Sequence, residues 1–588
     1  MAKYRRTGNH NWDTMMRADT TEFDETPGNE TGGRGALLWL YPLLAGFVAI
    51  LLVLQMLPLV LPIGPMYWDV LIYYDAIGRI AQGQWPGIDF FAPVGPLEYF
   101  LAAFSNALFP EAHPVLMTQW IWLPVTVPVM GLILWDTVRR GSRVALWLMV
   151  PWMLYTALPF NVIDFYPYPG TDAFGIYNRH GAILIYLVAA SVLFVRGPII
   201  QTICLSVLAL ALAFCKITAF IAVGPILLFG LILGRISLGT AIATALICIG
   251  VTGVVELSTG LVIPYVQDIL VLASQNTEAI LPRFLTAASQ HFNVFGAGGF
   301  LAIVLLLAAL FGHRSAGGRA SGNRLARSID APWFWVGLLL VCGLFYETQN
   351  TGGQAFLMVW PALLLILFRP LAGYGRFGAA ILVLIGFTAL PNVSTMLHKA
   401  ARAAAVAPGY ITLDAPDLGP IGRVSAKDVF VEQAERMRGI YISRRDTYEA
   451  IAETEALPSF ILFSDPDYQY LLLKEMQAAT VAIKALEASS GRKFERVLNL
   501  DFANPFPYIL RMKGTENVAI GADPSRALPM LDDSTRDAVA QTDLVLAPVC
   551  PVHRARNQLL EHYQSALTGH ARIALTPCFD AYVLPLDR

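Results

Sequence analysis

Residues 36–61 read ALLWLYPLLAGFVAILLVLQMLPLVL and contain no charged side chain. A helix needs about 20 apolar residues to cross the hydrocarbon core of a bilayer, so this stretch predicts a membrane-spanning helix. The whole chain has the same character, because 56% of its 588 residues are hydrophobic and only 14% are charged. Its mean hydropathy is +0.55. A soluble protein of this length needs more charge to cover its surface, so the composition indicates a membrane protein.

Further apolar segments follow, and together they predict about eleven membrane-spanning helices. The expected spans are 36–61, 115–136, 143–159, 180–196, 198–214, 217–234, 237–255, 296–312, 331–346, 354–369 and 377–391. The residues before the first span are polar, with acids and bases interspersed, and they lack the short apolar core of a cleavable signal peptide. We therefore expect a disordered cytoplasmic tail over residues 1–35.

The basic residues indicate how the chain is oriented. With the N-terminus inside, alternation of the spans makes the following bases cytoplasmic: Arg139, Arg140, Arg143, Arg196, Arg235, Arg314, Arg319, Arg324, Arg327, Arg369 and Arg376. The opposite loops hold mainly Arg79, Arg179 and Arg283. Because short cytoplasmic loops are enriched in Lys and Arg, we expect the N-terminus inside and the C-terminus outside.

One apolar segment is excluded as a span by the same rule. Residues 94–110 read VGPLEYFLAAFSNALFP, and a crossing there would move Arg139, Arg140 and Arg143 to the outer side. The segment is also short and carries Glu98 and Asn106. We therefore expect an amphipathic helix lying at the outer surface, within a long first outer loop over residues 62–114.

The composition changes again near residue 392. From 392 to 588, charges become frequent, and strand-like runs (497–502, 543–547, 572–575) alternate with helical patterns (427–438, 468–486, 554–567). This pattern predicts a small α/β domain, which the orientation of the chain places outside the cytoplasm. Cys550 and Cys578 lie in this region. They are candidates for a disulfide there, although the sequence does not show whether their Cα atoms are close enough.

The first outer loop carries two acids that could do chemistry. Asp69 follows Trp68 where a helix starts, and Tyr73 follows at helical spacing. A carboxylate at the membrane–water boundary could act as a general base toward a hydroxyl, and the alternative is an N-cap. Asp89 lies in GIDFFAPVGPL, a Gly/Pro-rich turn that suits a site but equally suits a simple connection between two surface helices.

The later outer loops add cations and hydrogen-bonding side chains. Arg179 and His180 border a span where a cation would bind a phosphate, and Lys216 interrupts the apolar run LAFCKITAF. A lysine at membrane depth is expensive, so a function with an anionic partner such as a lipid phosphate is expected. Further candidates for binding are Asp172, Tyr177, Asn178, Arg283, Glu347, Gln349 and Asn350. Snorkelling, capping or an ordinary interhelical turn remains the structural alternative for each of them.

These residues resemble parts of the GT-C superfamily of glycosyltransferases, the bacterial polyprenyl-phosphate-sugar enzymes of the protein-mannosyltransferase and aminoarabinose-transferase type. The resemblance rests on the acid that opens the long first outer loop, on DFFAPVGPL and the apolar helix after it, and on YNRHG, FCKITAF and ETQNTGG. It covers roughly residues 36–390. It implies a GT-C-like polytopic helical fold and an inverting transfer from a lipid-phosphate-linked sugar at the outer face.

The resemblance also implies roles for single residues. Asp69 matches the acid that deprotonates or orients the acceptor hydroxyl, and Asp89 is placed like the second loop acid of the family. Lys216, Arg179 and His180, with Arg283 in a lower rank, would neutralise the leaving lipid phosphate as the glycosidic bond breaks. The tandem acidic pair of many members is absent, which leaves open both a divalent metal and the choice of Asp69 or Asp89 as the base.

The sequence therefore predicts a glycosyltransferase of the bacterial inner membrane. Its donor would be a polyprenyl-phosphate-linked sugar in the membrane lipid, and its acceptor an envelope glycan, lipid or protein. No P-loop, GxSxG or HExxH motif is present, and the net charge of −2 does not point to a nucleic acid. The alternatives are a polysaccharide polymerase or ligase, a non-catalytic assembly protein, and a transporter of lipid-linked saccharides. A transporter usually has repeated halves, which this sequence does not show.

Cysteine accessibility tests the expected topology. Asn350→Cys should react from outside with a membrane-impermeant maleimide, whereas Gly318→Cys should react only after the membrane is opened, because the bases near 318 hold that loop inside. The wild-type chain gives the background labelling. Reaction of Gly318→Cys from outside would overturn the orientation.

Overall fold

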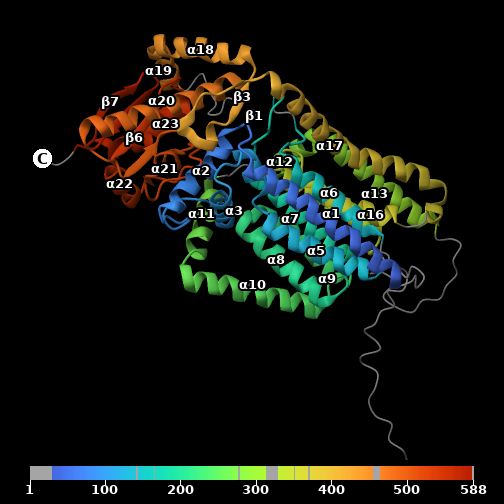
Figure 1. Ribbon diagram of the computed structural model, residues 1–588. Helices are drawn as coiled ribbons and strands as arrows, with labels where there is room; N and C mark the ends of the chain where they lie inside the picture. The colour runs from blue at the N-terminus through green and yellow to red at the C-terminus, as the bar shows by residue number, and fades with distance from the viewer. Residues whose placement is uncertain are drawn as a thin grey trace, which may run out of the picture.

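The fold is known from a computed structural model, which describes residues 30–140, 143–163, 166–275, 279–312, 329–349, 351–368, 371–454 and 464–585. Figure 1 shows long helices gathered in an elongated bundle, with an α/β domain at one end that contains the C-terminal part of the chain. The expected cytoplasmic tail over residues 1–35 lies almost wholly outside the described residues, since the first helix begins at Glu30.

The apolar segments form the helices of the bundle. Among the described residues, six helices are long and apolar enough to cross a membrane: α1 (Glu30–Met56), α7 (Ile176–Phe194), α8 (Pro198–Cys215), α10 (Leu238–Thr259), α13 (Phe292–Gly312) and α17 (Gly378–Val406). A seventh crossing results if α4 (Pro114–Trp120) and α5 (Leu123–Arg139), which are bent by 41°, count as one span. The chain is therefore a multi-pass membrane protein, as predicted.

The other expected spans are shorter apolar helices. They are α6 (Val144–Ala157), α9 (Ile217–Ile232), α15 (Pro332–Glu347), and the consecutive η3 (Ala355–Val359) and α16 (Trp360–Leu367). Each predicted segment thus contains an apolar helix, but the count of eleven crossings is not confirmed. The helix α17 also continues past residue 391, where the α/β domain was expected to begin, and contains Pro391 within it.

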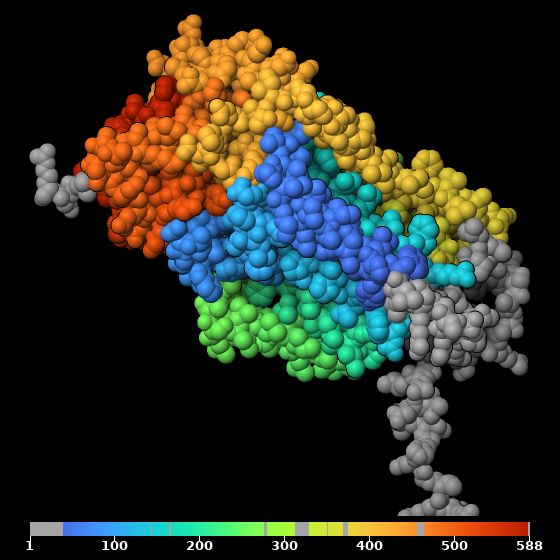
Figure 2. All heavy atoms as spheres, viewed as in Figure 1, coloured from blue at the N-terminus to red at the C-terminus, as the bar shows by residue number. Residues whose placement is uncertain are grey.

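Burial differs sharply between the helices of the bundle. In α7, 94% of the residues are buried, and the helix packs against α5, α8, α9 and η3. By contrast, only 6% of the residues of α10 are buried. Figures 1 and 2 show this helix, in green, along the outer edge of the bundle. A helix that is apolar on all sides and makes few protein contacts is suited to contact with lipid chains.

The first outer loop folds into two helices, α2 (Trp68–Ala81) and α3 (Pro96–Leu108). The helix α3 is the amphipathic helix expected at 94–110, and Phe104 and Leu108 are exposed on one of its faces. The other face packs inward, and it includes Glu98, which is 0% exposed. The polar side chain that favoured a surface position therefore points into the protein, for a reason given below.

The C-terminal region is an α/β domain, as predicted. Its five-stranded sheet has the order β5 (Lys513–Gly514), β4 (Arg496–Asn499), β6 (Leu544–Pro548), β8 (Phe579–Val583) and β7 (Ala571–Thr576). The pairs β5–β4 and β4–β6 are parallel, and the pairs β6–β8 and β8–β7 are antiparallel. The helices of the domain are α18 (Asp428–Ser443), α19 (Arg445–Glu453), α20 (Pro466–Ser490), α21 (Phe506–Leu510), α22 (Asp533–Ala540) and α23 (Arg554–Tyr563). Cys550 and Cys578 form the expected disulfide, with an S–S distance of 2.02 Å.

The domain and the first outer loop share a second, smaller sheet. In it β1 (Leu61–Pro62), directly after α1, pairs in parallel with β3 (Val424–Ala426), which also pairs with β2 (Ile411–Thr412). The domain is therefore bonded to the membrane region through backbone, not only through side chains.

A buried ion pair on α2 makes the second connection to the domain. Asp75 Oδ1 and Arg79 Nε lie 2.6 Å apart, and neither side chain is more than 1% exposed. Arg79 Nη1 also donates to the carbonyl of Thr515 at 2.7 Å. A Cβ on Gly514 would lie 2.2 Å from the guanidinium carbon, so the absence of a side chain there lets Arg79 reach the backbone of the domain.

Removing one partner of this pair should destabilise the whole chain. In Asp75→Asn the buried Arg79 loses its counter-charge, which costs about 3–5 kcal/mol and lowers the midpoint of thermal unfolding in detergent. The matched control is Asp533→Asn, because the Asp533–Arg536 pair is exposed and should contribute little. Equal midpoints for the two variants would contradict the docking role of the buried pair.

Candidate functional site

Asp69 is held by the second outer loop. It lies in the first turn of α2 and is 9% exposed, and its Oδ2 accepts a hydrogen bond from the N–H of Gly175 at 2.8 Å. The N-cap of α2 is Tyr67, and no side chain caps the helix. The carboxylate of Asp69 is therefore committed to a contact between two outer loops, not to capping its own helix.

A second acid and an arginine lie beside Asp69. The carboxylate of Asp172 accepts hydrogen bonds from Asn161 N at 3.2 Å and from Phe174 N at 2.9 Å. Arg179 Nη2 donates to the carbonyl of Asp172 at 2.8 Å. Arg179 is 0% exposed, and its Nε and Nη1 have no hydrogen-bond partner among the described residues. A buried guanidinium with two idle donors is suited to the oxygen atoms of a ligand or an ordered water.

Burial changes the acidity of both carboxyls. Desolvation raises the pKa of Asp69 to about 7, although the hydrogen bond from Gly175 lowers it. The negative charge of Asp172 raises this pKa further, whereas Arg526 and Arg179 lower it. Burial also raises the pKa of Asp172, against the effect of Arg179. A carboxyl that titrates near neutral pH can accept a proton from a substrate hydroxyl.

Lys216 lies in the turn between α8 and α9. Its Nζ donates to Asn178 Oδ1 and lies 5.0 Å from the ring centroid of Tyr177 and 5.7 Å from that of Tyr346. Tyr346 can come this close because Gly181 has no side chain, since a Cβ there would lie 2.1 Å from the Tyr346 hydroxyl. All three partners of the ammonium are neutral, so its positive charge can still attract an anion.

Arg283 adds a second cation near Lys216. It lies on α12 (Ile280–Gln290), its charge acts on Lys216, and its Nη2 donates to the carbonyl of Thr348 at 3.0 Å. The structure therefore groups Lys216, Arg283, Tyr177 and Asn178, all of which were proposed as binding residues from the sequence.

Glu347 and Gln349 shape the loop after α15. Glu347 Oε1 accepts from Ala355 N at 2.9 Å, and its Oε2 accepts from Gly353 N at 3.1 Å and lies 3.1 Å from His291 Nε2. Gln349 Nε2 donates to Thr348 Oγ1 at 2.9 Å. Glu347 thus joins this loop to His291, and its charge also acts on Lys216, whereas the hydrogen bond of Gln349 is local. Asn350 lies outside the described residues.

Asp89 has local contacts as well. Its Oδ2 accepts from Trp85 N at 2.6 Å and so closes the turn between residues 85 and 89. Asp69, by contrast, lies where the charges of Asp172 and Arg179 act on its ionisation. Of the two acids proposed as the base, Asp69 has the buried polar surroundings, whereas the side-chain contact of Asp89 is local.

Glu98 is the polar residue that the sequence analysis did not select. Its buried carboxylate lies 3.1 Å from His180 Nδ1 and accepts from Trp122 Nε1 at 3.0 Å and from Cys215 Sγ at 2.8 Å. Tyr73 donates to it at 3.4 Å. His180, proposed to bind the donor phosphate, and Tyr73, proposed to bind substrate, are therefore both partners of Glu98. An acid inside an apolar segment is a signal in itself and could have identified Glu98.

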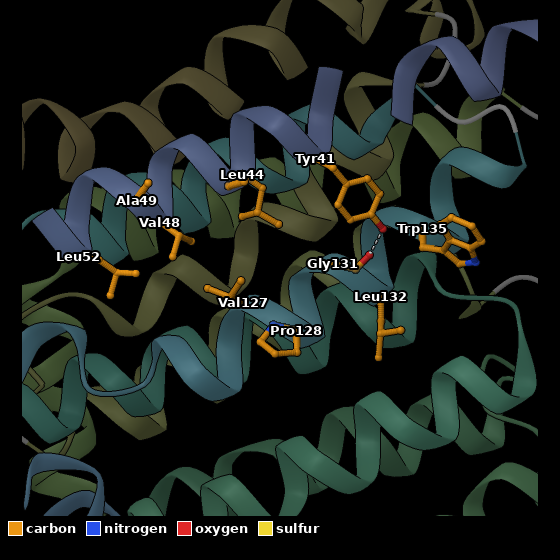
Figure 3. A pocket seen from close by; sticks show the side chains of 11 residues that line it. Tyr41, Leu44, Val48, Ala49, Leu52, Val127, Pro128, Gly131, Leu132 and Trp135 are labelled. Atoms are coloured by element: carbon orange, nitrogen blue, oxygen red, sulfur yellow. Dashed lines mark hydrogen bonds between the residues drawn. The ribbon is translucent and has the colours of Figure 1, made fainter. Parts of the chain in front are cut away.

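A large groove lies away from these polar residues. It has a volume of about 830 Å³, and it lies between α1 and α5, where apolar side chains line it, among them Leu44, Val48 and Leu132. Figure 3 shows its polar contact, a hydrogen bond of 2.9 Å from the Tyr41 hydroxyl to the Gly131 carbonyl. Such a groove on spanning helices suits lipid chains and offers nothing to the chemistry of a sugar.

A small cleft lies closer to the acids. Asp172 lines it together with Tyr166, Tyr168, Lys399 and Arg402, from the second outer loop and α17. Among the described residues, no three His, Cys, Asp or Glu side chains are grouped so that they could hold a metal ion.

The fold and the site define a multi-pass membrane protein with a cluster of acids and cations where the bundle meets its α/β domain. No protein-family model matches the chain, and no curated protein matches it. The chain is similar to two crystal structures of ArnT from Cupriavidus metallidurans, one in the apo state and one bound to undecaprenyl phosphate.

Both matches extend over nearly the whole chain but are distant. The identity is 13% in each, with 94% of this chain and 98% of the other covered at a TM-score of 0.41 in the apo structure. The values for the bound structure are 93%, 98% and 0.43. A likeness at this level assigns no activity to a chain, so the function is inferred from the side chains described above.

Proposed function

We propose that the chain is a membrane glycosyltransferase that transfers a sugar from a polyprenyl-phosphate donor to a hydroxyl group of an envelope glycan, lipid or protein. The observation that carries this proposal is the cluster around Asp69, a buried carboxyl with a pKa of about 7 beside a buried arginine with idle donors. The apolar helices of the bundle lie in a lipid bilayer, which is where a polyprenyl chain dissolves.

Asp69 acts as the general base in this proposal. Its carboxylate removes the proton from the acceptor hydroxyl while the hydroxyl oxygen attacks the anomeric carbon of the sugar. The bond between that carbon and the phosphate oxygen breaks, and the polyprenyl phosphate leaves with the electron pair. A single displacement of this kind inverts the configuration at the anomeric carbon.

The cations of the site have separate tasks. Negative charge grows on the leaving phosphate as the bond breaks, and Lys216 with Arg283 lies where this charge can be stabilised, at the turn between two apolar helices. Arg179 lies beside the base, and its idle donors suit hydroxyl oxygens of the sugar or the acceptor. Asp172 orients Arg179 through its carbonyl and keeps its carboxylate close to Asp69.

The outer face of the bacterial inner membrane is the proposed location of the site. The disulfide between Cys550 and Cys578 supports this side for the C-terminal domain, because such bonds persist in oxidising compartments and are rare in the cytosol. The bias of the short-loop bases supports the same orientation.

Replacing the base should abolish transfer. In Asp69→Asn the carboxamide cannot take the proton, so turnover should fall about 100-fold or more. Asp89→Asn is the matched control, because Asp89 closes a turn, and it should stay near the wild-type rate. Transfer is followed in membrane vesicles as the movement of radiolabel from the extracted polyprenyl-phosphate-sugar fraction to the envelope fraction. Full turnover in Asp69→Asn would refute the catalytic role.

Replacing the ammonium should weaken donor binding. Lys216→Met keeps the apolar stem but removes the charge, so the Kd for undecaprenyl phosphate should rise about tenfold, in keeping with the loss of a charged hydrogen bond. Lys216→Arg should retain most of the affinity. Lys484→Met, at an exposed position on α20, is the control. An unchanged Kd in Lys216→Met, measured by binding to the purified protein in nanodiscs, would remove Lys216 from the donor site.

A further inference from the structure

A segment of the C-terminal domain is hydrogen-bonded along the first outer loop, close to the site. Asn517 N donates to the carbonyl of Asp89 at 2.7 Å, and Phe91 N donates to the carbonyl of Val518 at 3.1 Å. Ile520 N donates back to the carbonyl of Phe91 at 3.2 Å, so Phe91 and Ala519 form a parallel bridge. Residues 517–520 of the domain are therefore fixed by backbone to the loop that follows α2.

The next residues of the domain lie against α2 itself. A Cβ on Gly521 would lie 3.2 Å from Ile72 Cδ1, and Ile72 is one helical turn after Asp69. The far end of this segment is fixed as well, because Gln275 Nε2 of α11 (Val262–Gln275) donates to the carbonyl of Leu528 at 2.9 Å. Between these two anchors the chain carries Arg526.

Asp523 sets the direction of Arg526. Asp523 is 4% exposed, and its Oδ1 accepts from Ser525 N at 2.9 Å, which makes a tight turn. Its Oδ2 accepts from Arg526 Nε at 2.7 Å. The Arg526 side chain remains 51% exposed, so Asp523 holds the guanidinium through a single hydrogen bond without burying it.

The charge of Arg526 reaches Asp69. It lowers the pKa of Asp69, as the charge of the buried Arg179 does, and it also acts on Tyr177. The other groups whose charges couple to Asp69 are Asp172, Tyr177 and Tyr99. Arg179 is shared with Asp172, to whose carbonyl it donates, so a second cation is needed to offset two neighbouring acids.

We propose that the C-terminal domain completes the site of the membrane region, and that Arg526 is the positioning residue that keeps Asp69 ionised. This inference rests on the proposed role of Asp69 as the base. A half-exposed arginine suits the task, because it supplies positive charge without the desolvation cost of a second buried guanidinium. Docking of the domain on α2 then contributes to catalysis, because it brings Arg526 close to Asp69.

The titration of Asp69 tests this inference directly. The infrared band of its protonated carboxyl is isolated in nanodiscs as the difference between wild type and Asp69→Asn, and followed against pH. In Arg526→Ala the midpoint should move up by about one pH unit, the low end of the effect of a neighbouring opposite charge. Arg526→Lys should restore most of the shift. The difference between wild type and Arg526→Ala should shrink in high salt, since Arg526 is half-exposed.

Arg536→Ala is the matched control, because Arg536 forms the same i,i+3 pair with Asp533 on the domain surface. It should titrate like the wild type. The acid limb of the transfer rate should shift upward in Arg526→Ala by the same amount as the infrared midpoint, since only the ionised carboxylate accepts a proton. A midpoint in Arg526→Ala equal to that of wild type and Arg536→Ala would overturn the inference.

The same variants separate this inference from the proposed function. Full transfer by Asp69→Asn would refute Asp69 as the base, whatever its midpoint. Loss of transfer in Asp69→Asn, with an unchanged midpoint in Arg526→Ala, would refute only the role of Arg526.

Discussion

The carboxylate of Glu98 is the contact on which the arrangement of the site depends. It lies on α3 and receives hydrogen bonds from Tyr73 on α2, Trp122 before α5, His180 on α7 and Cys215 at the end of α8. A buried carboxylate is costly unless all its partners are present, so these helices must come together around it or leave a charge unpaired. Because Tyr73, His180 and Cys215 each lie close in sequence to a functional residue, the same network sets the positions of Asp69, Arg179 and Lys216.

The acids and the cations of the site lie in different places. Asp69 and Asp172 are buried together, and burial raises the pKa of both carboxyls, as the proposed role of Asp69 as a base near neutral pH requires. The cations are separated from one another, with Arg179 beside the acids and Lys216 with Arg283 toward the membrane. Separation of this kind suits a reaction that takes a proton at one end and releases a phosphate at the other.

The C-terminal domain is joined to this site by more than its linker. The shared sheet of β1 and β3, the Asp75–Arg79 pair against Thr515 and the bridge of Phe91 to Ala519 all fix the domain to the first outer loop. Since α2 carries both Asp69 and the Asp75–Arg79 pair, the position of Asp69 and the docking of the domain depend on the same helix. A movement of the domain would therefore change the position of α2 and with it that of Asp69.

The sequence by itself determined the membrane class, the apolar helices, the amphipathic helix at 94–110, the α/β domain and its candidate disulfide, because each depends on local composition or period. It also indicated Asp69, Arg179 and Lys216 as candidates for catalysis or phosphate binding. Only the tertiary structure distinguished the surroundings of Asp69 from those of Asp89, because burial and the partners of a carboxyl depend on distant loops. It alone showed that His180 and Tyr73 are bound to Glu98, and it brought Arg526 to a site more than 400 residues earlier in the chain. Such contacts leave no periodic trace in the sequence, since they are made across loops that are distant along the chain.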